Sequence, residues 1–235
     1  WALEAAAGWE SDLTARSQLG AIMDNVRKSE LLSRPMCQDT GIPIFYVKGK
    51  FDSSIIDDIK KGIIRATKEI PLRPNTVDPL SRKNYGDNLG EGMPIVHFLP
   101  TKDNFTEITV MPKGAGSDNM TKLVMLNPSA TVEDIEKVVI DTVLDAEGRP
   151  CPPGIIGIGI GGTSDSCVSM AKEALLMPVG EENPDPVLNK IEENIFVKLN
   201  ESGLGPMGLG GNTTVLGVRA MKAACHTASL PVAIN

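Results

Sequence analysis

The chain has 235 residues, of which 23 are Lys or Arg and 30 are Asp or Glu, so its net charge is −7. This length allows one large domain or two small ones and suffices for a sizeable core without disulfides. No apolar run approaches the roughly 18 residues that a membrane span needs, and no signal peptide is recognisable, so we expect a cytoplasmic protein with no membrane partner. An acidic chain without a long basic run also argues against a nucleic-acid partner.

Hydrophobic periodicity and turn residues predict an alternation of helices and strands. The predicted elements, in chain order, are helix 11–32, strand 43–47, helix 54–70, strands 94–99 and 105–111, a helix from 131, strand 155–160, a helix ending at 176 and helix 187–199. Residues 71–92 have no period and many turn residues, and such long loops are usually functional or disordered. Without an internal repeat or linker, we expect one α+β domain over 1–235, with helices packed on a small mixed sheet and Gly-rich loops at the active site.

Four cysteines occur, at positions 37, 151, 167 and 225, and no two of them form a C-x-x-C pair. This spacing disfavours a zinc ribbon, a thioredoxin-type redox site and a ferredoxin-type cluster motif. Isolated cysteines in a reducing compartment are usually small buried residues. The context of two of them differs, because Cys37 precedes Gln38 and Asp39, and Cys151 precedes two prolines. Cysteine followed by proline is one context in which a thiolate binds an iron–sulfur cluster.

The 23 glycines concentrate in three clusters, at 114–116, 157–162 and 203–211. Each glycine costs backbone entropy, so a cluster indicates tight turns, close packing or a backbone that approaches a ligand. The second cluster lies between a predicted strand and a predicted helix, where backbone N–H groups favour anions. Its sequence does not match the dinucleotide or P-loop fingerprints, so phosphate binding is weakly supported and packing alone stays an alternative.

Six segments, in this order along nearly the whole chain, resemble the class I, iron–sulfur-dependent fumarate hydratases and the related L(+)-tartrate dehydratases. They are RPMCQDTG (34–41), RKNYGDN (82–88), KGAGSDN (113–119), CPPGIIGIGIGGTS (151–164), GLGPMGLGGNTTVLGV (203–218) and HTASLPVAIN (226–235). The resemblance implies the α subunit of a hydro-lyase, with a β subunit supplying the second domain, in an α homodimer or an α2β2 assembly. KGAGSDN is more similar to the fumarase version, which favours reversible hydration of fumarate to L-malate, a tricarboxylic acid cycle reaction; L(+)-tartrate or a related hydroxy-diacid is the alternative.

The resemblance also implies a 4Fe–4S cluster that is held by three cysteines and acts as a Lewis acid. Cys37 and Cys151 match two of its ligands. The third family cysteine lies a short way beyond the histidine matched by His226, so we expect it after Asn235 and consider Cys225 an alternative.

The remaining site residues are carried over from the same motifs. Asp39 matches a member of the proton-transfer network, and His226 matches an active-site histidine that serves as general acid or base. Gln38 matches a substrate contact, Arg73 an arginine that clamps a carboxylate, and Gly116 a loop whose backbone meets the substrate.

Each assignment has a simpler alternative. Asp39 can cap a turn, His226 can be a hydrogen-bonded interior residue, and Arg73 can be a surface residue in a loop. We expect His97 and Cys167 to be structural. At the level of function, the alternatives are a non-catalytic protein that binds an anion on the same scaffold, and a redox thiol protein.

Overall fold

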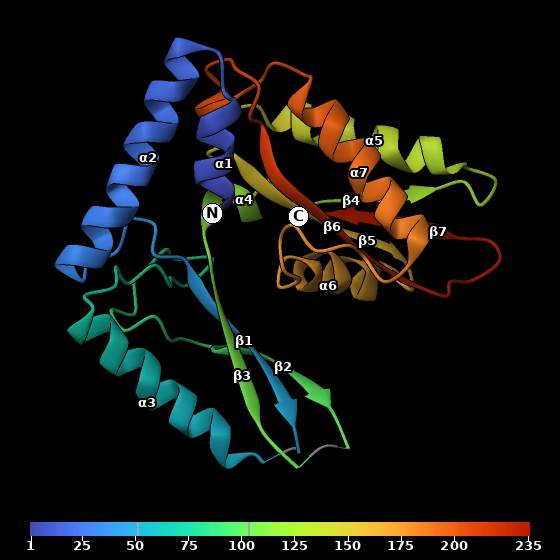
Figure 1. Cartoon of the computed structure of the whole chain (residues 1–235). Helices are drawn as coiled ribbons and strands as arrows, with labels where there is room; N and C mark the ends of the chain where they lie inside the picture. The colour runs from blue at the N-terminus through green and yellow to red at the C-terminus, as the bar shows by residue number, and fades with distance from the viewer. Residues whose placement is uncertain (51, 103) are drawn as a thin grey trace. The chain divides into compact units, whose positions relative to one another are not determined.

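The computed structural model describes residues 1–50, 52–102 and 104–235 (Figure 1). Within these residues the chain forms seven α-helices and seven β-strands in two mixed sheets, which confirms the α+β class; the sequence analysis expected one sheet. Contacts divide the chain into two compact units, one of residues 25–115 and one of residues 1–24 and 116–235. Among the described residues, no helix combines the length and the apolar character that crossing a membrane requires.

The unit of residues 25–115 contains a three-stranded sheet of order β2-β1-β3 and the helix α3. Its elements are β1 (Ile42–Gly49), α3 (Ser54–Glu69), β2 (Ile95–Pro100) and β3 (Glu107–Lys113). The central strand β1 pairs with β2 in parallel and with β3 antiparallel. Phe45 and Val47 of β1 form a buried cluster with Ile59 and Ile63 of α3, whose four-residue spacing places them on one helix face. The segment 71–94 between α3 and β2 is irregular, as predicted, apart from one bridge between Val77 and Asn84.

The other unit contains a four-stranded sheet of order β4-β7-β5-β6. Its elements are α1 (Ala2–Trp9), the start of α2 (Leu13–Leu32), α4 (Ala115–Asp118), β4 (Lys122–Leu126), α5 (Val132–Ala146), β5 (Gly154–Gly161), α6 (Ser164–Ala174), α7 (Pro186–Asn200), a 3-10 turn (Pro206–Gly208), β6 (Val215–Ala223) and β7 (Leu230–Ile234). Helix α6 covers one face of this sheet, and α5 and α7 cover the other (Figure 1). The largest buried cluster lies on the α5/α7 side.

Strand β5 explains the second glycine cluster. Its isoleucines and glycines alternate, so Ile158, fully buried, faces the core formed with α5 and α7 while Gly157 and Gly159 face α6. A Cβ atom on Gly159 would lie 2.1 Å from the carbonyl oxygen of Cys167, and one on Gly157 would lie 2.0 Å from that of Ala171. The glycines therefore let the backbone of α6 approach the strand. This is the close packing that the sequence analysis gave as the alternative to anion binding.

Several elements differ from those expected. The predicted helix 11–32 is preceded by a separate helix, α1, and α2 begins at Leu13, where Asp12 rather than Ser11 accepts the backbone N–H of Ala15. The strands β4, β6 and β7 were not predicted. Strands β4 and β7 have only five residues each, and β7 contains Pro231, so neither shows a clear alternation of apolar and polar residues.

We expect Gly159→Ala to lower the free energy of unfolding by more than about 2 kcal/mol, because the new methyl group overlaps the backbone of α6. The matched control is Gly20→Ala in α2, where a Cβ meets nothing within 4 Å. That substitution should raise the free energy of unfolding by about 0.5–1 kcal/mol, the usual gain from removing a helical glycine. Urea denaturation monitored by circular dichroism measures both values. Equal stability of the Gly159→Ala variant and the natural chain would show that α6 is not held this close.

Candidate active site

The segment after α2 carries the first motif and is shaped by the Asp39 carboxylate. Its Oδ1 accepts the backbone N–H of Gly41 at 3.1 Å, and its Oδ2 accepts that of Ala115 at 2.7 Å. The N–H of Asp39 donates to Sγ of Cys37 at 3.4 Å, and the Cys37 side chain is exposed. Asp39 therefore does cap its own turn, which is the simpler alternative. The same carboxylate also binds the backbone of a loop that lies 76 residues further along the chain.

Two glycines make this contact possible. A Cβ on Gly114 would lie 3.1 Å from Oδ2 of Asp39, and one on Gly41 would lie 2.8 Å from the backbone nitrogen of Lys113. Gly41 also has a φ of +76°, which favours glycine. The turn around Asp39 and the loop after β3 therefore form one closely packed piece.

Arg73 lies in the irregular segment after α3. Its carbonyl oxygen accepts hydrogen bonds from Oγ1 of Thr40 at 3.2 Å and from Nδ2 of Asn88 at 3.1 Å. Asn75 connects the same segments, because its Nδ2 donates to Thr40 Oγ1 and its backbone N–H donates to Asn88 Oδ1. The sequence analysis missed these partners; the signal available was the density of Asn and Gly in 75–88.

A cavity of about 810 Å³ borders this region. It lies within residues 25–115 and is lined by the end of α2, the first motif and the end of α3, including Cys37, Asp39 and Thr40. Gln38 is exposed, and so is the Arg73 side chain, whose guanidinium makes no hydrogen bond or ion pair with any residue that the structure describes.

Cys151 belongs to the other unit and lies in the turn that follows α5. It is exposed, has a φ of +58°, and donates its backbone N–H to the carbonyl oxygen of Gly148 at 3.1 Å. Gly116 lies against the same turn, since a Cβ there would be 3.0 Å from the carbonyl oxygen of Arg149. The third glycine cluster packs here as well, with the N–H of Met207 donating to the carbonyl oxygen of Pro152 at 2.8 Å.

His226 lies in the loop between β6 and β7 and is exposed, so the interior alternative for it is wrong. Its Nδ1 accepts the backbone N–H of Ala228 at 3.0 Å. Because a neutral imidazole has one donor and one acceptor nitrogen, this bond leaves the proton on Nε2. The ring can therefore present an N–H donor to a ligand. The second histidine, His97, stacks on Tyr46 within the sheet.

Cys37, Gln38, Asp39 and Arg73 thus belong to residues 25–115, whereas Gly116, Cys151 and His226 belong to the other unit. Among residues 1–50, 52–102 and 104–235, no group of three or more His, Cys, Asp or Glu side chains is placed to hold a metal ion. Cys37, Cys151 and Cys225 are nevertheless exposed free thiols. Thiolates are the usual ligands of iron–sulfur clusters, so each of these cysteines is chemically suited to bind one.

The turn before α6, a candidate anion site, is already satisfied by the chain itself. The hydroxyl of Ser166 accepts the backbone N–H of Thr163 at 2.8 Å. The pKa of the Asp165 carboxyl is lowered, first by a hydrogen bond from the Thr163 hydroxyl and then by backbone N–H groups of the first helical turn. A carboxylate of the chain thus already interacts with the N-terminal turn of α6.

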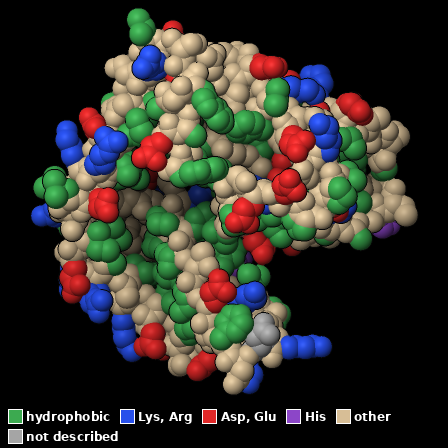
Figure 2. Space-filling model, in the orientation of Figure 1, with side chains coloured by type: hydrophobic (Ala, Val, Ile, Leu, Met, Phe, Trp, Pro, Cys, Tyr) green, Lys and Arg blue, Asp and Glu red, His purple; other side chains and the backbone are tan. Residues whose placement is uncertain are grey.

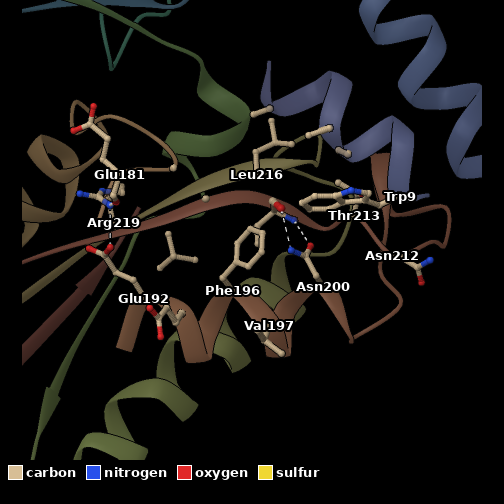
Figure 3. Close-up of a pocket in the computed structure, with 18 of the residues that line it drawn as sticks. Trp9, Glu181, Glu192, Phe196, Val197, Asn200, Asn212, Thr213, Leu216 and Arg219 are labelled. Carbon is tan, nitrogen blue, oxygen red and sulfur yellow. Dashed lines mark hydrogen bonds and ion pairs between the residues drawn. The ribbon is translucent and has the colours of Figure 1, made fainter. Parts of the chain in front are cut away.

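A larger cavity, of about 860 Å³, lies between α1, α7 and β6 in the unit of residues 1–24 and 116–235 (Figure 3). Trp9, Phe196 and Leu216 give it an apolar wall, and hydrophobic side chains gather over α1 and α7 in Figure 2. Arg219 and Glu192 are buried at one end and paired at 3.0 Å. Its exposed charged lining residues are all acidic: Glu181, Glu182, Glu193 and Glu201. This cavity includes none of the predicted site residues and would repel a dicarboxylate.

Cys167 is fully buried on α6, as expected, and its Sγ donates to the carbonyl oxygen of Gly159 at 3.2 Å. Burial raises the pKa of its thiol to about 11. At pH 8 only about 0.1% of such a thiol is thiolate, the reactive form. In the metal-free chain, we therefore expect iodoacetamide to modify Cys37, Cys151 and Cys225 in the native state and Cys167 only after unfolding in urea. Peptide mass spectrometry measures the labelling, and rapid native labelling of Cys167 would contradict its burial.

Comparison of the sequence with known proteins places the chain in a family. The family described as fumarate hydratase (fumerase) matches residues 1–235. The chain is 46% identical to a Methanocaldococcus jannaschii protein provisionally named L(+)-tartrate dehydratase subunit alpha, over 99% of this chain and 85% of that protein. It is 37% identical to a Geobacillus stearothermophilus protein provisionally named fumarate hydratase class I, over 87% of this chain and 42% of that protein. It is 33% identical to the L(+)-tartrate dehydratase subunit alpha of Escherichia coli K12, over 91% and 72% of the two chains. The chain belongs to the class I fumarate hydratase family and is a hydro-lyase.

Proposed function

We propose that the chain is the α subunit of a class I fumarate hydratase and takes part in the reversible hydration of fumarate to L-malate. The observation that carries this proposal is the hydrogen bond from the N–H of Ala115 to the Asp39 carboxylate. It joins two segments of the family resemblance, 34–41 and 113–119, beside an exposed cysteine and a cavity. The sequence of the second segment, KGAGSDN, favours fumarate as the substrate.

Binding of a C4 dicarboxylate needs a cation and several polar contacts. We assign Arg73 to one substrate carboxylate, because its exposed guanidinium is not used by any described side chain and its planar fork suits two parallel hydrogen bonds. Gln38 and the backbone at Gly116 are assigned to the remaining substrate contacts.

Proton transfer is assigned to His226 and Asp39. The Nδ1 bond of His226 fixes the ring so that Nε2 carries the proton, which makes this atom the donor in the direction that releases water. Each carboxylate oxygen of Asp39 accepts one backbone N–H, and a carboxylate oxygen has room for a second hydrogen bond. Asp39 can therefore hold its place and still exchange a proton with a neighbouring group.

We further propose that Cys37 and Cys151 are two of the three thiolate ligands of a 4Fe–4S cluster, with Cys225 as the alternative third. An iron without a thiolate supplies Lewis-acid chemistry toward a substrate hydroxyl. Support comes from the family, from the free and exposed state of these thiols, and from the proline that follows Cys151.

A second candidate is L(+)-tartrate dehydration, which is favoured by the names of two relatives, at 46% and 33% identity. Both reactions add or remove water at a C4 diacid, so the same residues serve either substrate. Because these two relatives are named alpha subunits, we propose a β subunit as partner, in an α2β2 assembly or around an α homodimer, in the cytoplasm.

The first test is a side-by-side assay. After anaerobic reconstitution with iron and sulfide, the chain together with its β subunit should hydrate fumarate with a kcat/KM at least about 10-fold above that for L(+)-tartrate, a ratio that corresponds to about 1.4 kcal/mol. The loss of the fumarate ultraviolet absorbance follows the reaction. Preference for L(+)-tartrate would select the second candidate, and inactivity with both diacids would contradict the proposed function.

The cluster ligands are tested by substitution. We expect Cys151→Ser to lose most of the bound iron, the visible absorbance of the cluster and more than about 100-fold of the activity, beyond what an outer-shell change typically costs. Cys167→Ala is the matched control and should keep iron and absorbance, because this thiol of α6 is buried against β5. Cys225→Ser decides whether Cys225 is the third ligand. Full iron content in Cys151→Ser would refute the assignment of Cys151.

A further inference from the structure

We propose that Asn88 is a positioning residue for the substrate-binding arginine and acts through the backbone of Arg73. The inference rests on the proposed function, because that function assigns Arg73 to a substrate carboxylate. It concerns only residues 25–115.

Asn88 uses its whole amide. Its side chain is only 2% exposed. Nδ2 donates to the carbonyl oxygen of Arg73 and to Oγ1 of Thr67, both at 3.1 Å, and Oδ1 accepts the backbone N–H of Asn75 at 2.6 Å. An aspartate of the same shape has no donor for the Arg73 carbonyl oxygen or for Oγ1 of Thr67, and a leucine has neither a donor nor an acceptor. The three bonds therefore require asparagine chemistry at this length.

The Arg73 carbonyl is also held from the side of the first motif. Thr40, the residue after Asp39, donates its hydroxyl to the same carbonyl oxygen at 3.2 Å. Asn75 closes the connection by donating Nδ2 to Oγ1 of Thr40 and to the carbonyl oxygen of Gly41, each at 3.3 Å. The backbone from Arg73 to Asn75 is thus tied to the segment that carries the Asp39 carboxylate.

The network has a rigid base. Thr67 lies in the last turn of α3 and donates its hydroxyl to the carbonyl oxygen of Ile63, a buried residue of the helix core. Asn84, in the same motif as Asn88, donates Nδ2 to the carbonyl oxygen of Pro74 at 2.7 Å. Side-chain amides therefore do for this irregular segment what strand pairing does elsewhere, which is to bind backbone groups and fix their positions.

This arrangement matters for binding because the Arg73 guanidinium has no partner among the described residues. The ligand must order the Arg73 side chain. The position of the Arg73 Cα atom therefore sets the direction from which the guanidinium approaches the substrate carboxylate. A displacement of about 1 Å at a positioning group can cost about 100-fold in rate or binding. Asn88 fixes that Cα without touching the ligand.

The test uses the reconstituted αβ pair with Asn88→Gly and Asn88→Asp. Asn88 has a φ of +60°, which glycine adopts without strain, so Asn88→Gly deletes the amide and keeps the backbone. Asn88→Asp keeps the shape and removes the two donors. The control is Asn104→Gly, because Asn104 is an exposed residue bound by Nζ of Lys50 at 3.0 Å.

In either Asn88 variant we expect the KM for fumarate to rise at least about 10-fold while kcat changes by less than about 3-fold and the iron content is unchanged. A merely structural role would lower the amount of folded enzyme and leave KM alone. The sharper measurement is the double-mutant cycle with Arg73→Ala. Asn88→Gly should add little to the effect of Arg73→Ala, since it acts through that residue, and fully additive effects on KM would overturn the proposal.

Hydrogen exchange provides a readout that does not depend on activity. In Asn88→Gly, peptides covering 37–41 and 71–76 should exchange faster than in the natural chain and in Asn104→Gly, while the β5 peptide is unchanged. If both peptides exchange in Asn88→Gly as slowly as in the natural chain, the inference is overturned, even if the enzyme is active. An enzyme inactive with both diacids would contradict the proposed function instead, and the exchange data would still decide whether Asn88 holds Arg73.

Discussion

The double hydrogen bond of the Asp39 carboxylate is the constraint on which the candidate site depends. One oxygen closes the turn to Gly41, and the other binds Ala115, 76 residues away in the chain. A carboxylate that receives two backbone N–H groups is fixed in both position and orientation. The positions of the Cys37 sulfur on one side and of Thr40 on the other follow from it, because both belong to the same short turn.

Glycine serves three different purposes in this chain, which its number alone does not reveal. In β5, glycine permits the backbone of α6 to approach the strand, although Gly157 and Gly159 have ordinary φ values. At position 41, glycine provides a left-handed conformation and at the same time space for the backbone of Lys113. At position 114, it leaves room for the Asp39 carboxylate. Only the last two purposes bear on the candidate site.

The longer helices could be predicted, because their apolar residues recur at helical spacing, whereas α1 and the short α4 were not predicted. The helix predicted over 54–70 spans Ser54–Glu69, and the one predicted to open at Thr131 begins at Val132 with Thr131 as its N-cap. The strands β4, β6 and β7 could not be predicted in this way. Their pairing partners are distant in sequence, and β6 buries Arg219, a residue type that usually indicates exposure.

The residues of the candidate site could be proposed from motifs, whereas the contacts that hold them could not. Asp39, Arg73 and His226 follow from a family resemblance, whereas the asparagines that hold Arg73 are joined by hydrogen bonds that have no sequence period. The two arginines show what a sequence does not reveal. Arg219 is 4% exposed and its charge is used by Glu192, while the Arg73 side chain is exposed and no described residue neutralises it. The carboxylate of Glu192 already pairs with the buried guanidinium of Arg219, so of these two arginines we propose only Arg73 for a substrate carboxylate, and the protein holds Arg73 by its backbone rather than by its head group.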